Sequence, residues 1–331
     1  MPVDLVTGAT GLVGGNLVRA LLARGRRVRV LVRPSSRAPH LAELPDVEHA
    51  PGDVTDPDSL AAACAGMEDV YHCAALVSMW PRMADAMWKV NVEGTDHVIA
   101  AARRAGVRRL VHCSSVDAIG LPEDGTPSGE ETPWNWDRLG LDNPYARTKY
   151  ESQRRVLAAA RTLDAVVVNP TFMLGAWDAR PSSGRMILEV AAGKAVGYPA
   201  GGNNFVDVED VAAGMIAAAE RGRRGECYIL GGVDLTYREM FTLIAEVLGV
   251  RPPRVALPYP LAWVGGRAGD VIGMLTGREP AVTSITARLG WVGHYYSPRK
   301  AIAELGLPQT PIRAAIERAV RWFRAHGMLA T

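Results

Sequence analysis

The stretch that decides the fold reads Val3-Asp4-Leu5-Val6-Thr7-Gly8-Ala9-Thr10-Gly11-Leu12-Val13-Gly14. A strand-like apolar run ends in three glycines at positions i, i+3 and i+6, and a helix-like segment follows. In such a turn Gly8 permits the tight bend, Gly11 lets backbone approach a pyrophosphate, and Gly14 lets the helix pack closely on the strand. The helix N-terminus adds N–H donors and a positive dipole end. We therefore predict a dinucleotide-binding loop formed by Thr7, Gly8, Thr10, Gly11, Leu12, Val13 and Gly14.

Strand-like and helix-like segments alternate from this loop to Pro170, which predicts βαβ units and a parallel sheet. After Pro170 the alternation loosens into a loop rich in Gly, Pro and Ser and then into mainly helical sequence. We expect an α/β fold, a Rossmann-type doubly wound parallel sheet with a smaller, mainly helical C-terminal substrate domain made of non-contiguous pieces. The expected dinucleotide domain covers 1–172, with about 205–232 returning to it, and 173–204 and 233–331 form the substrate domain.

Composition excludes several classes of protein. Of the 331 residues, 48% are hydrophobic and 22% charged, which is typical of a globular chain, and the net charge of +2 includes no long basic run that would follow a nucleic acid. The four cysteines have no zinc-ligand spacing, so we predict no metal and free thiols of a reducing compartment. Prolines, glycines and charges interrupt the apolar stretch 255–275, which we expect to pack and not to span a membrane. We expect a cytoplasmic protein with a small-molecule substrate.

The end of the second strand indicates which nicotinamide cofactor binds. NAD sites place a carboxylate about twenty residues after the glycines, where it accepts hydrogen bonds from the ribose hydroxyls. Here the strand ends in Arg33, and Arg37 follows shortly after it. Because arginine pairs bidentately with phosphate, Arg33, Ser36 and Arg37 favour the 2′-phosphate of NADP(H), and NAD(H) is the less favoured cofactor.

Two further strand ends are candidates for cofactor contacts by position alone. Asp53 and Val54 follow the third strand and could reach the adenine, while Ala74 and Ala75 follow the fourth and would let the cofactor lie against backbone. His72 ends the fourth strand, and we interpret it as a buried strand residue.

The sharpest catalytic signal is Tyr145-Ala146-Arg147-Thr148-Lys149, which follows the helix start Asn143-Pro144. Tyr145 and Lys149 would lie one turn apart on one helix face, where the ammonium group would lower the tyrosine pKa. Tyr145 could then exchange a proton with a carbonyl or alcohol oxygen. Tyr296 and Lys300 repeat the spacing, but we interpret them as coincidental because Ser297-Pro298 places Tyr296 outside the helix.

A serine pair ends the fifth strand and would lie at the carboxyl edge where open α/β sheets bind ligands. Ser115 is the preferred residue for a hydrogen bond to the substrate oxygen, and Ser114 is the alternative because adjacent strand residues point to opposite faces.

These motifs resemble the extended short-chain dehydrogenases/reductases, the family with a Thr-Gly-x-x-Gly-x-x-Gly loop, a strand-end Ser and Tyr-x-x-x-Lys. The match runs over about residues 1–230 and is similar in particular to dihydroflavonol-reductase-like proteins, including 3β-hydroxysteroid dehydrogenases and hopanoid-associated sugar epimerases. The resemblance implies a homodimer, a catalytic set of Ser115, Tyr145, Lys149 and a supporting Asn91, and nicotinamide contacts from Pro170, Thr171 and Phe172. Ile119 and Asp207 depart from the family pattern.

Aromatic, thioether and polar side chains near these motifs are candidates for the substrate walls, since ligand sites are mostly apolar with a few polar groups. The candidates are Ser78, Met79, Trp80, Trp134, Trp136, Met173, Arg185 and Met186. The leading hypothesis is an NADP(H)-dependent oxidoreductase of a hydrophobic, ring-containing ketone or secondary alcohol. The alternatives are a sugar-nucleotide epimerase or dehydratase with tightly bound NAD, and a non-catalytic NADP-binding redox sensor.

Overall fold

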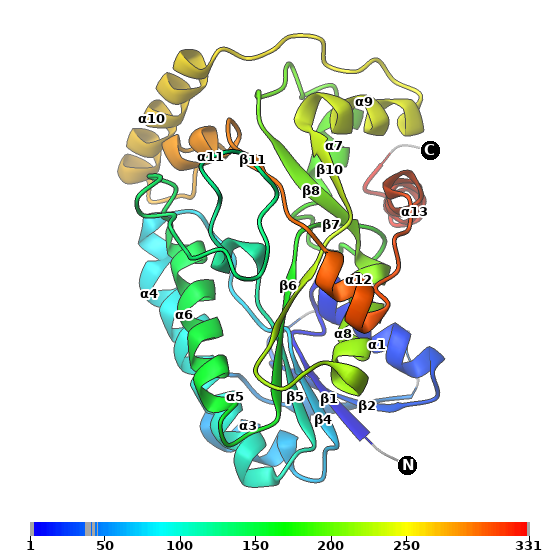
Figure 1. Cartoon of the computed structure of the whole chain (residues 1–331). Coiled ribbons are helices and arrows are strands. Elements are labelled where there is room, and N and C mark those ends of the chain that lie inside the picture. Colours follow the sequence, from blue (N-terminus) through cyan, green and yellow to red (C-terminus); the bar gives the residue numbers. More distant parts are fainter. Residues whose placement is uncertain (1–2, 37–40, 42–43, 45, 330–331) are drawn as a thin grey trace.

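A computed structural model describes residues 3–36, 41, 44 and 46–329, and its centre is a seven-stranded parallel sheet (Figure 1). The strands lie in the order β3-β2-β1-β4-β5-β6-β9, so the chain reverses its winding direction between β1 and β4. The strands of this main sheet are β1 (Val3–Thr7), β2 (Arg27–Val32), β3 (Val47–Pro51), β4 (Asp69–His72), β5 (Arg109–Cys113), β6 (Ala165–Pro170) and β9 (Cys227–Leu230). The predicted doubly wound architecture is confirmed, and so is the late return of the chain to the sheet as β9.

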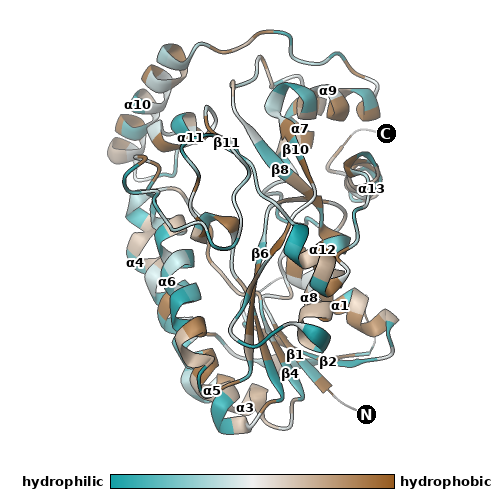
Figure 2. Cartoon of the chain, in the orientation of Figure 1, coloured by the Kyte–Doolittle hydropathy of each residue, from teal (hydrophilic) through white to brown (hydrophobic). Residues whose placement is uncertain are grey.

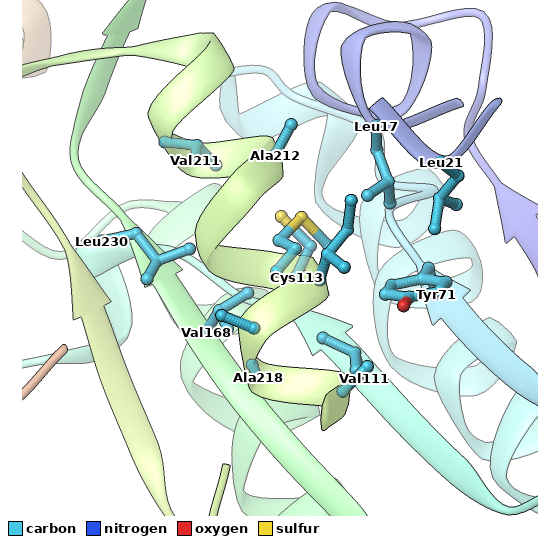
Figure 3. Packing of buried hydrophobic residues seen from close by; sticks show 14 of the residues in the cluster. Leu17, Leu21, Tyr71, Val111, Cys113, Val168, Val211, Ala212, Ala218 and Leu230 are labelled. Carbon is cyan, nitrogen blue, oxygen red and sulfur yellow. The ribbon is translucent and has the colours of Figure 1, made fainter. Parts of the chain in front are cut away.

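Helices cover both faces of the main sheet. One face carries α1 (Leu12–Ala23) and α8 (Val208–Arg221), and the other carries α3 (Pro57–Cys64), α5 (Gly94–Ala105) and α6 (Pro144–Ala159). Adjacent strand residues point to opposite faces, so Val6 packs on the α1/α8 side and Leu5 on the α3/α5 side. Figure 3 shows the first of these cores, which gathers Leu17 of α1 and Val211 of α8 with strand residues such as Val111 and Val168. Burial on both faces explains why the central strand β6 is rich in apolar, β-branched residues, and Figure 2 shows this apolar colour along β6.

A second, smaller unit stands above the carboxyl ends of the main sheet (Figure 1). Its sheet is built on β8 (Gly202–Asp207), with the short neighbours β7 (Phe172–Leu174), β10 (Val233–Thr236) and β11 (Gly293–His294). Its helices are α7 (Arg185–Ala191), α9 (Tyr237–Leu248), α10 (Tyr259–Thr276), α11 (Ser284–Leu289) and α13 (Ile312–Ala325). A further helix, α12 (Arg299–Leu305), packs on α8. The sequence analysis did not predict this small sheet.

The region between β4 and α5 is less regular than expected. In place of one helix from residue 83, the chain forms a 3₁₀ turn (Pro81–Met83), the short α4 (Ala84–Met87) and a π-helical turn (Trp88–Glu93). π turns often occur at functional sites, and this one carries the buried Asn91.

Candidate active site

A cavity of about 910 Å³ lies at the carboxyl ends of the main strands, where open α/β sheets bind their ligands. Residues that follow β1 to β6 form its floor, and residues of the smaller unit form the opposite wall. Of the predicted cofactor contacts, the following line the cavity: Gly8, Thr10, Gly11, Leu12, Val13, Gly14, Arg33, Ser36, Asp53, Val54, Ala74, Ala75, Lys149, Pro170, Thr171 and Phe172. Arg37 lies outside the described residues.

The glycine loop has the geometry of a phosphate cradle. Gly8 has φ +74°, and a Cβ there would lie 2.5 Å from the Ala74 nitrogen, while a Cβ on Gly14 would lie 2.4 Å from the Gly8 oxygen. Only glycine therefore fits these two positions. A Cβ on Gly11 would meet nothing nearer than the Gly8 oxygen at 3.5 Å, so Gly11 is open toward the cavity. No described side chain caps α1, which leaves its first N–H groups as donors for an anion. The loop thus fits a dinucleotide pyrophosphate.

The end of β2 places Arg33 on the cavity wall in an exposed position. The Ser36 N–H donates to the Arg33 carbonyl at 2.8 Å, and this turn brings Ser36 to the same wall. A guanidinium and a hydroxyl therefore stand where a carboxylate stands in many NAD sites.

The structure places Thr7 in a different role from the predicted one. Thr7 is fully buried and does not line the cavity. Its hydroxyl pairs with His72 Nδ1 at 2.8 Å and accepts from the Ala74 N–H at 3.2 Å. Thr7 therefore holds the β4 end in place. His72 is buried as expected, and burial lowers its pKa to about 3, so its imidazole is neutral.

Tyr145, Lys149 and both serines line the cavity. Asn143 caps α6 by accepting from the Ala146 N–H at 3.0 Å, and Pro144 occupies the first turn, so α6 begins where the sequence predicted. The Ser115 hydroxyl lies near the Tyr145 phenol and acts to lower its pKa. Lys149 Nζ donates to the Cys113 carbonyl at 2.7 Å. Ser115 is thus the serine beside the tyrosine, while the Ser114 hydroxyl is buried and has no partner among the described residues.

The electrostatics of Tyr145 differ from the prediction. Burial raises the pKa of Tyr145 above its usual range, the nearby Asp117 raises it further, and only the Ser115 hydroxyl opposes this. Burial also lowers the pKa of Lys149. The prediction of a lowered tyrosine pKa is therefore wrong for the protein chain alone, because desolvation dominates and Lys149 is not among the groups that shift the pKa of Tyr145. Tyr145 keeps its proton at neutral pH.

Asn91 supports the site through a neighbour of Lys149. Its amide nitrogen donates to the Leu76 carbonyl at 2.9 Å and to the Thr148 hydroxyl at 3.0 Å, and its oxygen accepts from the Leu76 N–H at 2.7 Å. Asn91 thereby fastens the loop after β4 to α6, and no hydrogen bond joins it directly to Lys149.

Half of the predicted substrate residues line the cavity, namely Ser78, Met79, Met173 and Arg185. Trp136 does not, because it is 1% exposed and its indole donates to the Ile119 carbonyl. Trp134 stacks on Tyr150, Trp80 lies against Arg82, and Met186 packs into the core of the smaller unit. Trp80, Trp134, Trp136 and Met186 thus do not line this cavity, unlike the prediction.

Asp117 and Glu279 are among the cavity residues that the sequence did not predict. Asp117 lines the cavity two residues after Ser115, and its N–H donates to the Ser115 hydroxyl at 3.2 Å. Burial raises the pKa of Asp117 to about 6, and Lys149 opposes that rise. Glu279 comes from the loop after α10 and accepts from the Ser78 hydroxyl at 2.6 Å. The proximity of Asp117 to Ser115 in the sequence was a usable signal, whereas nothing in the sequence placed Glu279 here.

The glycine cradle, the switch point of the sheet and the Ser-Tyr-Lys group define a nicotinamide-dependent enzyme of the short-chain dehydrogenase/reductase type. The chain belongs to the NAD dependent epimerase/dehydratase family, whose model matches residues 5–231.

Two full-length relatives and one solved structure illustrate the range of this family. A Synechocystis sp. protein named after dihydroflavonol 4-reductase is 38% identical over 98% of this chain and 96% of its own. Sterol demethylase protein B of Methylococcus capsulatus is 40% identical over 98% of this chain and 99% of its own. The crystal structure of a nucleoside-diphosphate-sugar epimerase from Pseudomonas aeruginosa superposes with a TM-score of 0.81, at 28% identity and 99% coverage of both chains.

Proposed function

We propose that this enzyme transfers hydride between NADP(H) and a ketone or secondary alcohol of a hydrophobic, ring-containing small molecule, with Tyr145 as the general acid/base. The observation that carries the proposal is that Tyr145, Ser115 and Lys149 line one cavity whose wall also carries Arg33. The apolar cavity residues Met79 and Met173 and the names of the two relatives support a hydrophobic substrate.

Three residues of the site have defined tasks in this reaction. The nicotinamide supplies or accepts hydride when bound. Tyr145, which is protonated at neutral pH, donates its proton to the carbonyl oxygen in the reducing direction and accepts it in the oxidising direction. Ser115 lies beside the phenol, where its hydroxyl can bind the substrate oxygen, and Lys149 is held by the Cys113 carbonyl.

The test is NADPH oxidation with a panel of cyclic ketones by wild type, Tyr145→Phe and Tyr296→Phe. Tyr296 is a matched control because it repeats the Tyr-x-x-x-Lys spacing but is 1% exposed and outside the cavity. Loss of an acid/base group lowers turnover by about 10²–10⁴-fold, so Tyr145→Phe should show that loss while Tyr296→Phe keeps activity. Equal activity of all three proteins would refute the role of Tyr145.

A nucleotide-sugar reaction is the second candidate function. It is favoured by the structural similarity to the Pseudomonas aeruginosa epimerase and by Arg180 and Arg185, two cations on the cavity wall that suit a diphosphate. Epimerisation of a nucleoside-diphosphate sugar, with no turnover of any ketone in the panel, would replace the leading proposal with this one.

A further inference from the structure

Helix α10 is attached to the protein by its glycines. A Cβ on Gly266 would lie 2.6 Å from the Thr283 oxygen, and one on Gly269 would lie 2.0 Å from the Val282 oxygen. The buried residues of the helix are Gly266 and Gly273, so one face of α10 rests directly on the chain segment that follows it. The remaining faces have little contact with the protein, and Figure 1 shows α10 at the periphery of the smaller unit. The expectation that this stretch packs inside the protein is therefore wrong for most of its side chains.

The opposite face of α10 is apolar and exposed. Leu261, Val264, Ile272 and Leu275 recur at helical spacing, and their exposed fractions are 65%, 57%, 57% and 82%. At 100° per residue they fall on one stripe that faces away from the glycines. Trp263 and Met274 extend the exposed apolar area at its side. We call these six residues the α10 surface. Globular proteins rarely expose a contiguous apolar patch of this kind unless it binds something.

The charged residues around the α10 surface are mostly basic. Between residues 250 and 283 the chain has four basic residues, Arg251, Arg254, Arg267 and Arg278, and all four are exposed. The same segment has two acidic residues: Asp270 accepts from the Ser284 N–H and pairs with Arg267 at 4.0 Å, and Glu279 accepts from the Ser78 hydroxyl, so the segment keeps a net charge of +2. The surface therefore combines exposed apolar side chains with exposed guanidinium groups.

We propose that the α10 surface docks the enzyme on the face of a membrane that contains anionic lipids. Apolar side chains enter the boundary between headgroups and acyl chains, and the arginines bind the lipid phosphates. No described helix is long and apolar enough to cross a bilayer, so α10 lies in the plane of the interface. The proposal is independent of the proposed function, because docking can be measured without turnover.

The position of α10 beside the cavity is consistent with this partner. Arg82 donates to the Met274 carbonyl at 3.0 Å, and Glu279, three residues past the helix end, lines the cavity. The docked enzyme would thus hold its substrate cavity next to the lipid phase, where a hydrophobic substrate dissolves.

A second copy of the chain fits the α10 surface less well than a membrane does. A two-fold interface would bring the same patch against itself, with Arg267 and Arg278 of both copies around it. Asp270 pairs with Arg267 within each copy, whereas Arg278 forms no ion pair among the described residues, so the charge of Arg278 would remain uncompensated in such an interface.

The experiment is flotation of the full-length protein with phosphatidylcholine vesicles, with and without phosphatidylglycerol. We expect binding to the anionic vesicles that weakens when salt is added. Leu261→Ser/Leu275→Ser and Arg267→Glu/Arg278→Glu should each weaken it by about tenfold or more. Val196→Ser is the control, because Val196 is 76% exposed on a different loop and should leave binding unchanged.

The substituted side chains are exposed, so equal melting temperatures will show that each variant folds. Absence of wild-type binding to anionic vesicles would overturn the proposal, and so would binding that the two double variants leave intact. If wild type is a dimer that ignores vesicles and Leu261→Ser/Leu275→Ser is a monomer, the α10 surface belongs to a second copy and the proposal is wrong.

Discussion

Replacement of Gly11 by alanine should separate cofactor binding from folding. The backbone at Gly11 has φ −95° and ψ 171°, which any residue adopts, and the added Cβ meets only one protein atom, at 3.5 Å. Alanine restricts the unfolded chain, a gain of about 0.4–1 kcal/mol, and it is a poorer N-cap than glycine by a similar amount. The free energy of unfolding should therefore stay within about 0.5 kcal/mol of wild type.

The same methyl group should weaken dinucleotide binding strongly. It projects into the cavity, where the backbone of Gly11 would otherwise approach a phosphate. A hydrogen bond to a charged group contributes about 1.5–3 kcal/mol, so loss of one such bond corresponds to an affinity loss of about tenfold or more.

Gly8→Ala and Gly25→Ala are the comparison variants for Gly11→Ala. Unlike Gly11, Gly8 and Gly25 have left-handed backbone, with φ +74° and +72°. A Cβ on Gly25 meets nothing within 4 Å, so its cost is the left-handed backbone alone, about 1–2 kcal/mol. A Cβ on Gly8 also clashes with the backbone of Ala74, which adds about 1–3 kcal/mol. Urea unfolding and NADPH titration of the three variants test these values. A Gly11→Ala protein that binds as tightly as wild type, or a Gly8→Ala protein as stable as Gly25→Ala, would refute the reasoning.

Three stability predictions follow from buried polar groups. The pKa of Asp117 is raised to about 6 in the folded chain from 3.8, so its destabilising effect grows as pH rises from 3.8 to 6 and is complete above 6. Asp117→Asn should accordingly gain up to about 3 kcal/mol at pH 8 and almost nothing at pH 4, and equal gains at both would contradict this. Asn91→Ala should lose about 2–4 kcal/mol in urea unfolding, because the Leu76 N–H and carbonyl lose their partner, and a loss below about 1 kcal/mol would argue against the fastening role. Tyr296→Phe should be neutral or more stable by thermal unfolding, since the Tyr296 hydroxyl has no partner among the described residues, and a large loss of stability would reveal one.

The sequence was sufficient for the parts of the site that local geometry determines. The glycine loop depends on residues within one turn, and the Tyr145–Lys149 pair lies on a single helix whose start is encoded by Asn143-Pro144. Their positions in the fold follow from the alternation of strands and helices. A local signal, the helix start Ser297-Pro298, also distinguished the pair Tyr296 and Lys300 from the pair Tyr145 and Lys149. Lys300 lies in α12 and bonds Glu226.

The substrate side of the cavity could not be predicted because it depends on distant packing. Trp134 and Trp136 are large apolar residues near the site, but whether such a ring lines a cavity or fills a core is decided by partners such as Tyr150 and His294. Glu279 reaches the cavity from 201 residues beyond Ser78. The tyrosine pKa was misjudged for a related reason, since the depth of burial of Tyr145 is a property of the whole fold.

The central claim is that the protein binds NADP(H) exchangeably and that Arg33 provides the preference for NADP(H) over NAD(H). Fluorescence titration with NADPH and NADH tests this most directly, after a check for nucleotide that co-purifies. The account predicts that wild type binds NADPH at least about tenfold more tightly than NADH, a difference of ~1.4 kcal/mol. Arg33→Ala should lose this preference, while Arg154→Ala, on the exposed face of α6, should keep it. Retained NAD, or a clear preference for NADH in wild type, would contradict the claim.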